Sequence, residues 1–332
     1  MTSRPFLPAA LAASATVAAL LAAGLLMPRW LLFLGTIAAS YGIVTLGIVL
    51  LMRSGVVSFG QGLVYAAGGY VAGLAYNRLG VTDAVLLILV GGTAAALAGA
   101  VVGPLLARYR GIFFSMLTLA LSMVLYGALV KSPAIGGSDG FNVGRPTMLG
   151  WTPPDAYADY AIYALAMVVT GIVAFLATVY FRSARGLVSL AIRDNDLRVE
   201  YLGASVQAAI AVNFTLAAAL GGIGGALTVM ALGHIDPNFA YWTTSGEFVF
   251  VAILSGHHGV VAVFIASVLL ELVRSFSSLY FPHMWQFSLG LFLLLVILFL
   301  PRGIGSLWSK RAATAGRSRA PAVRSTRGEA VP

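Results

Sequence analysis

Charged residues, which are the residues best able to do chemistry, are concentrated in one short stretch of this chain. The segment RSARGLVSLAIRDNDLRVEYLG (182–203) holds seven of the 31 charged residues of the 332-residue sequence. Leu187, Leu190 and Ala191 recur there with helical spacing. A polar residue at 194–196 can cap a new helix start, and Gly203 stands where a helix-ending glycine belongs. The stretch therefore predicts a short amphipathic helix, which either docks a protein or is an ordinary solvated loop.

The sequence lacks the motifs of common catalytic centres. Cysteine is absent, which excludes a thiol nucleophile and a cysteine-ligated metal. Neither of the two lysines follows a glycine-rich loop as a P-loop requires. The four histidines lie near expected helix ends, at His234, His257, His258 and His283. We therefore expect a protein that is not an enzyme, with no catalytic residue, no metal and no cofactor of its own.

Two glutamates fall inside apolar segments, where carboxylates could carry protons. Glu271 has Arg274 three residues later, so we expect a local ion pair near the outer end of its helix. Glu247 begins a short segment and is expected at the membrane interface. This interpretation gives little support to proton-coupled transport.

The elements that must position these residues are long apolar runs. The chain is 60% hydrophobic and only 9% charged, whereas a soluble domain carries about 25% charged residues. Because a spanning helix needs about 20 apolar residues, we expect an all-α, polytopic membrane helical bundle with about ten membrane segments, some of them short or broken. The expected segments are 6–27, 30–52, 56–77, 84–107, 111–131, 158–181, 207–232, 243–256, 259–276 and 284–300.

The placement of basic residues predicts the orientation. With both termini inside, only five of the 20 Lys and Arg residues fall outside: Arg29, Arg78, Lys131, Arg145 and Arg274. Basic loops favour the cytoplasmic side, so we expect a multi-pass protein with both termini in the cytoplasm. The net charge of +9 then reflects topology and a basic tail, and predicts no nucleic-acid partner.

We divide the chain into a membrane domain (1–301) and a basic tail (302–332). The domain has a long outer loop (132–157) and a long inner loop (182–206). The tail is polar and expected to be disordered, with membrane lipid as its simplest partner. The first apolar run could be a cleaved signal peptide, but its length favours a retained helix.

Five motifs in order along the chain carry a resemblance to a known family. They are SGVVSFGQGLVYAAGGYVAG (54–73), RYRGIFFSMLTLALSMVL (108–125), GGSDG (136–140), SARG…AIRDND…EYLG (183–203) and AAALGGIGGAL (217–227), and the terminal LFLPRGIGSLW (298–308) agrees as well. Together they resemble the permease subunits of branched-chain amino-acid ABC importers, on the LivM side of the LivH/LivM permease family. The resemblance covers about residues 35–308.

The resemblance implies a membrane-spanning permease of an ATP-driven importer in the bacterial inner membrane, which moves branched-chain or related amino acids by alternating access. In such importers the inner loop forms a coupling helix that sits in a groove of an ATP-binding subunit. The residues to which this role carries over are Ala191, Ile192, Arg193, Asp194, Asn195 and Gly203. The implied partners are a second permease of the LivH type, two ABC subunits that bind ATP and magnesium, and an extracytoplasmic binding protein.

A zwitterionic amino acid needs polar groups within the bundle, and two segments offer them. The candidate pathway residues are Ser58, Gln61, Tyr65, Ser115 and Thr118. The alternative is that small and hydroxyl residues only let membrane helices approach closely. In the outer loop, Asp139 and Arg145 are candidate contacts for the binding protein.

Departures from the family pattern bear on partners and substrate. Leu187 stands where the family has arginine, and Val199 and Tyr201 replace small residues, which could change the ATPase that docks. The segment SGHHG (255–259) replaces a glycine-rich turn and could change gating or substrate. Sibling permeases for urea, amides or aromatic acids remain an alternative, as does an autonomous ion-coupled carrier.

Overall fold

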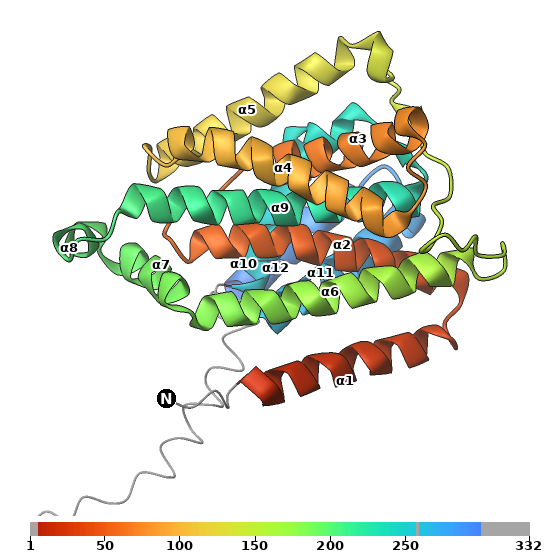
Figure 1. The fold of residues 1–332 in the computed structure, drawn as a ribbon, viewed down its shortest axis with the longest axis horizontal. Helices are drawn as coiled ribbons and strands as arrows, with labels where there is room; N and C mark the ends of the chain where they lie inside the picture. Colours follow the sequence, from red (N-terminus) through yellow and green to blue (C-terminus); the bar gives the residue numbers. More distant parts are fainter. Residues whose placement is uncertain (1–5, 257–258, 300–332) are drawn as a thin grey trace, which may run out of the picture.

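The protein folds as a bundle of α-helices, described by a computed structural model over residues 6–256 and 259–299 (Figure 1). The helices are α1 (Phe6–Gly24), α2 (Arg29–Met52), α3 (Gln61–Leu79), α4 (Ala84–Leu106), α5 (Ile112–Val130), α6 (Ala158–Arg182), α7 (Ala184–Asp194), α8 (Asp196–Tyr201), α9 (Val206–Leu232), α10 (Trp242–Ser255), α11 (Val260–Tyr280) and α12 (Trp285–Phe299). Two 3₁₀ turns, η1 (Pro133–Ile135) and η2 (Pro237–Ala240), and two short strands, β1 (Phe141–Asn142) and β2 (His234–Ile235), complete it.

The helical character expected from the sequence is confirmed. Within the described residues, six helices are long and apolar enough to cross a membrane: α2, α4, α5, α6, α9 and α11. The count of about ten segments stays a prediction. The expected tail (302–332) and His257 and His258 of the SGHHG segment lie outside the described residues.

The start of α3 differs from the sequence prediction. A helix was expected from residue 56, but α3 begins at Gln61, and residues 56–58 have no regular structure. Gly55 has φ +77° just before this segment, a value that ends a helix. Ser58 and Gly60 follow before the helix, and Gly62 lies in its first turn. Glycine weakens helical conformation, so these residues disfavour an earlier start of α3.

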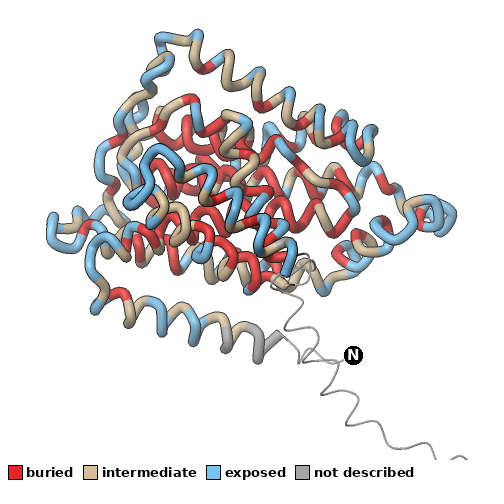
Figure 2. Tube along the Cα trace, turned by 180° about the vertical axis from the view of Figure 1, so that it is seen from behind, coloured by how far each residue is buried: buried red, intermediate tan, exposed pale blue. Residues whose placement is uncertain are grey.

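Helix α2 forms the centre of the bundle. Of its most apolar 18-residue window, 94% is buried, against 22% for α5. Buried residues concentrate in the middle of the molecule and become sparse toward α1 and α5 at opposite edges (Figures 1 and 2). Large apolar side chains are exposed on α5, including Ile112, Phe113, Met116 and Val124, as suits a lipid-facing helix.

Helices α3, α4 and α9 approach closely because glycines face one another. A Cβ atom added to Gly68 would lie 2.2 Å from the Cα of Gly222, and one added to Gly222 would lie 2.5 Å from the carbonyl oxygen of Gly91. Small residues permit such backbone contact in membrane bundles. These glycines therefore serve the close packing of the three helices.

The outer loop is clipped to the end of α9. Strand β1 pairs antiparallel with β2, with Phe141 opposite Ile235. The GGSDG turn precedes this clip, and a Cβ on Gly140 (φ +70°) would meet the carbonyl oxygen of Ile235 at 1.9 Å. Position 140 therefore requires glycine, because of its positive φ and its close approach to the backbone of β2.

We predict that Gly68→Ala lowers the thermal unfolding midpoint of the purified protein in detergent. Forcing an atom into the α3–α9 contact costs about 1–3 kcal/mol. Gly127→Ala on α5 is the matched control, because its added Cβ meets nothing within 4 Å in the described part of the chain. Equal midpoints for the two variants would show that α3 and α9 are not tightly packed.

Candidate functional site

The charged inner stretch forms two short helices, α7 and α8, that meet at an elbow. Ser183 caps α7 by accepting a hydrogen bond from the Gly186 amide, and Asn195 caps α8 by accepting one from the Arg198 amide at 2.9 Å. Of the three expected cap positions, Asn195 is the one that caps. Gly203, with φ +87°, follows the end of α8 as expected.

Two buried apolar residues and the half-buried Val188 hold this elbow to the bundle. Ile192 and Val199 are 5% and 6% exposed and pack with residues at the inner ends of α4, α5 and α9. Of the predicted coupling residues, Ile192 is therefore an anchor, whereas Ala191, Arg193, Asp194, Asn195 and Gly203 are exposed. Apolar side chains are exposed beside them: Leu187, Leu197, Tyr201 and Leu202. The elbow thus presents a mixed polar and apolar surface to solvent.

Arg110, in the turn between α4 and α5, fixes α8 from the side. Its guanidinium donates to Asp196, and to Glu200 at 2.8 Å. Partial burial alone would lower the pKa of Arg110, but its hydrogen bonds to the two carboxylates raise it. Exposed ion pairs contribute little stability, so this bridge mainly sets the position of α8. Sequence reasoning did not single out Arg110.

The elbow touches the non-helical segment that leads into α3. A Cβ on Gly55 would lie 3.4 Å from the Cα of Arg193, which places the two backbones in contact. A polar cavity of about 230 Å³ lies beside this contact, between Ser54–Val56, Arg110 and residues 192–196. The elbow and the residues before α3 are therefore in direct backbone contact.

Asn213 is a buried polar hub at the same level. Its Nδ2 donates to the hydroxyls of Ser54 and of Ser189, the latter at 2.9 Å, and its Oδ1 accepts from Tyr180 at 2.5 Å. The hub joins α9, α7, α6 and the residues after α2. A lone amide in the apolar run of α9 was a visible sequence signal, but only the tertiary structure identifies its partners.

Four of the five predicted pathway residues gather around the break before α3, where they bond to backbone. The Ser115 hydroxyl donates to the Val57 carbonyl at 2.7 Å, and Thr118 accepts from the Phe59 amide at 3.2 Å. Ser58 accepts from the Gly60 amide at 3.2 Å. These contacts satisfy non-helical backbone at membrane depth, where an unpaired polar group is costly.

Gln61 joins three helices from the first position of α3. Its Nε2 donates to the carbonyl oxygens of Val44 (3.2 Å) and Ala217 (3.1 Å), and its side chain is fully buried. The amide therefore links α2, α3 and α9 in this conformation. Whether Gln61 also lines the pathway stays a prediction.

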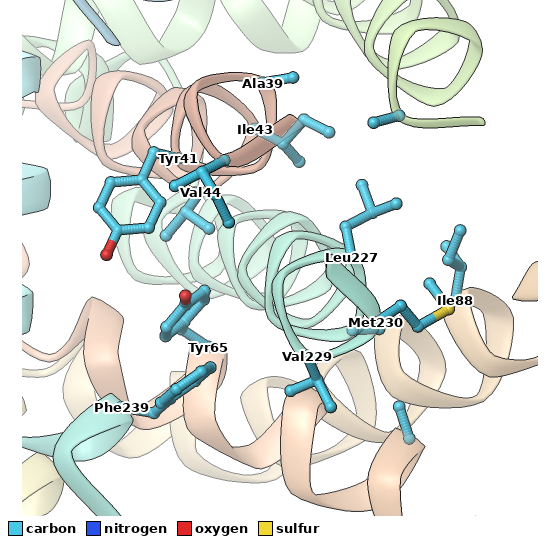
Figure 3. Close-up of a cluster of buried hydrophobic side chains, with 14 of the residues drawn as sticks. Ala39, Tyr41, Ile43, Val44, Tyr65, Ile88, Leu227, Val229, Met230 and Phe239 are labelled. Atoms are coloured by element: carbon cyan, nitrogen blue, oxygen red, sulfur yellow. The ribbon is translucent and has the colours of Figure 1, made fainter. Parts of the chain in front are cut away.

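Tyr65 lies one turn further, within a group of aromatic rings. Its ring stacks on that of Phe239, with 4.9 Å between the ring centroids, and meets the Phe248 ring edge-on at a centroid distance of 5.0 Å. The Tyr41 and Phe248 ring centroids are 4.8 Å apart. Figure 3 shows Tyr41, Tyr65 and Phe239 on the same side of the buried cluster. Tyr65 is 1% exposed, so it is a packing residue in this state.

An apolar groove of about 600 Å³ runs along the same break. It lies between α5 and α10 and is lined by Val57, Phe59, Ser115 and Ile253, among others. Ser115 is the one predicted pathway residue that borders it. The groove brings the non-helical segment close to the surface of the bundle.

Glu247 is largely buried within the protein and ion-paired, and its expected place at the membrane interface stays a prediction. Its side chain is 13% exposed, and its carboxylate lies 3.1 Å from the guanidinium of Arg274 on α11. Glu271 is the more distant partner, at 4.0 Å. Only the i,i+3 pair could be predicted from the sequence, because the contact between α10 and α11 is tertiary.

The predicted contacts for a binding protein are exposed residues of the loop 132–157. Asp139 is exposed and accepts a hydrogen bond from Ser138 at 3.0 Å. Arg145 is also exposed and forms an ion pair with Asp155. The positions suit an outer partner, but the role stays a prediction.

Comparison with known proteins gives one family. The profile described as "Branched-chain amino acid transport system / permease component" matches residues 30–300. The chain is 26% identical over 300 residues to the "High-affinity branched-chain amino acid transport system permease protein LivM" of Escherichia coli (strain K12), covering 82% of this chain and 69% of that protein.

The match with this chain covers nearly the whole length of two further relatives. The LivH permease protein of Escherichia coli (strain K12) is 24% identical over 284 residues, which is 81% of this chain and 92% of LivH. The BraD permease protein of Pseudomonas aeruginosa is 25% identical over 285 residues, with the same coverage. The search of solved structures returned no match.

We predict that Asn213→Leu lowers the thermal unfolding midpoint, because it leaves Tyr180, Ser54 and Ser189 with fewer partners. Each unsatisfied buried polar group costs about 1–3 kcal/mol. Val212→Leu is the control, since residue 212 is 40% exposed and adjacent in sequence. A midpoint unchanged by Asn213→Leu would contradict the hub.

We predict that Gln61→Ala lowers transport and thermal stability together. Loss of two buried hydrogen bonds costs about 1–3 kcal/mol. Uptake in cells and the unfolding midpoint of the purified chain measure the two effects. A loss of uptake at wild-type stability would instead favour direct contact of Gln61 with the transported solute.

Proposed function

This chain belongs to the family of branched-chain amino acid transport permeases, and we propose that it is the membrane-spanning permease subunit of an ATP-driven ABC importer. The observation that carries the proposal is the family match over residues 30–300. The substrates we propose are branched-chain or related amino acids, in line with the names of the relatives. Translocation would follow alternating access, with no covalent chemistry in this subunit.

The proposed membrane arrangement has about ten segments and both termini in the cytoplasm of a bacterium, with the chain in the inner membrane. The six long apolar helices support a membrane protein. Helices α3 and α10 are proposed as short segments that begin inside the membrane, because contacts from α5 reach their first turns. Ser122 on α5 donates to the Ala240 carbonyl just before α10, at 2.8 Å.

The α7–α8 elbow is the proposed docking site for an ATP-binding subunit, which would carry ATP and magnesium. Its exposed Arg193, Asp194 and Leu197 support this role. The contact between Arg193 and Gly55 offers a route by which ATP-driven closure would move the segment before α3. A second permease of the LivH type and an extracytoplasmic binding protein, the latter near Asp139 and Arg145, complete the proposed assembly.

The assembly is tested by gentle purification of a tagged chain from its native membrane, followed by mass spectrometry. We expect a second permease and P-loop ATPases in the same complex. Recovery of a stable, isolated chain would instead favour an autonomous carrier. Uptake under ATP depletion with ion gradients clamped separates the two classes, because an importer of this type stops.

We predict that the double exchange Arg193→Glu with Asp194→Lys abolishes uptake and association with the ATPase. Both residues are exposed, so the protein should still insert and fold. Uptake of labelled leucine and co-purification of the ATPase are the measurements.

The matched control is Lys131→Glu with Asp159→Lys, which changes the same kinds of charge on exposed outer residues. The control should transport normally. Normal uptake by the Arg193/Asp194 variant would exclude the elbow as the docking site.

A further inference from the structure

A cluster of charges lies inside the bundle, where α10, α11 and α2 meet. Arg274 on α11 contacts Glu247 at 3.1 Å and Glu271 at 4.0 Å. Both glutamate side chains are 13% exposed. Charged groups at membrane depth are costly and face the bundle interior or water, and they mark solute pathways.

The depth of the cluster follows from its helices. Arg274 lies six residues before the end of α11 at Tyr280, which is about 9 Å along the helix. Arg274 also donates to the hydroxyl of Tyr41 at 3.0 Å, and Tyr41 lies 12 residues into α2, about 18 Å from its start. The charges are therefore below the surface of the bundle.

Each kind of charge in the cluster has unused hydrogen-bonding capacity. The Oε2 atom of Glu271 is buried and has no hydrogen-bond partner among the described residues. An arginine has five N–H donors, and the hydrogen bonds and ion pairs of Arg274 with described residues all use Nη1. Nε and Nη2 have no hydrogen-bond partner in the described part of the chain, and the side chain of Arg274 is 31% exposed.

Aromatic rings border the charges. The Arg274 guanidinium lies 5.8 Å from the Tyr41 ring centroid and 5.5 Å from that of Trp285 on α12. Tyr41 in turn packs against Phe248. An apolar side chain brought to the cluster would thus find an apolar neighbourhood beside the charges.

We propose that Glu271, Glu247 and Arg274 form a transit site for the head group of a zwitterionic α-amino acid. The ammonium group pairs with Oε2 of Glu271, which has the Arg274 ion pair at 4.0 Å but no hydrogen bond among the described residues, and the carboxylate accepts hydrogen bonds from Nε and Nη2 of Arg274. Planar carboxylates fit the arginine fork in this way. The assignment rests on the proposed function, because it takes an amino acid as the substrate.

The test uses the complete importer in proteoliposomes, with its binding protein and ATPases, and L-leucine as the probe. Glu271→Gln keeps the size of the side chain and removes its charge. Leucine transported per ATP should fall about tenfold or more, the loss expected for one charge-assisted hydrogen bond. Glu271→Asp keeps the charge and should restore part of the transport.

Ser267→Ala is the matched control, one turn earlier on α11 and buried, and it should transport like the wild type. An unchanged leucine-to-ATP ratio in Glu271→Gln would overturn the site. Wild-type uptake that collapses when the proton gradient is dissipated at constant ATP would also overturn it, because the carboxylates would then carry protons. If the wild-type assembly moves no leucine or other amino acid, the proposed function itself is wrong.

A second measurement needs no variant. Photo-leucine, which carries a diazirine in its side chain, is illuminated in the turning-over wild-type assembly. Labelling of Tyr41, Phe248 or Trp285 supports the site. Labelling confined to the α5 side of the groove overturns it.

Discussion

The structure depends on one constraint: backbone amides and carbonyls at membrane depth must find partners inside the protein. The chain leaves helical geometry between α2 and α3, and the hydroxyls of Ser115, Thr118 and Ser58 bond to the freed backbone groups. A side chain also satisfies the backbone amide of Gly62, which donates a hydrogen bond to the hydroxyl of Ser245 on α10 at 2.9 Å. These side chains allow α3 to begin within the bundle.

The α7–α8 elbow contacts the segment between α2 and α3, and Gln61, with its buried hydrogen bonds, directly follows that segment. On the inner side, Gly55 contacts Arg193, and Asn213 ties Ser54 to α7. On the opposite side, Gln61 holds the first turn of α3 to α2 and α9. The exposed elbow and the buried polar groups are therefore joined through the non-helical segment between α2 and α3.

The sequence predicted local features well and tertiary ones poorly. Segment boundaries such as 158–181 for α6 agree closely because hydropathy determines them. The helical character of residues 182–203 followed from capping residues and charge, although one short helix was expected and the structure has two. The start of α3 was missed because its apolar residues continue through a break that glycines and side-chain bonds create. The pairing of Glu247 with Arg274 joins two helices, and no spacing within either helix indicates it. The roles of Ser58 and Thr118 as backbone partners likewise need the neighbouring helix to be known.

The hydrogen bond between Gln61 and Ala217 has a consequence for the synthesis of the chain. Its two partners are 156 residues apart, and α3 is absent from the long apolar helices found in the described part of the chain. While the ribosome is still making the residues between them, the amide of Gln61 lacks its acceptor on α9. The hydrogen bond that joins α3 to α9 can therefore form only after residue 217 has been made.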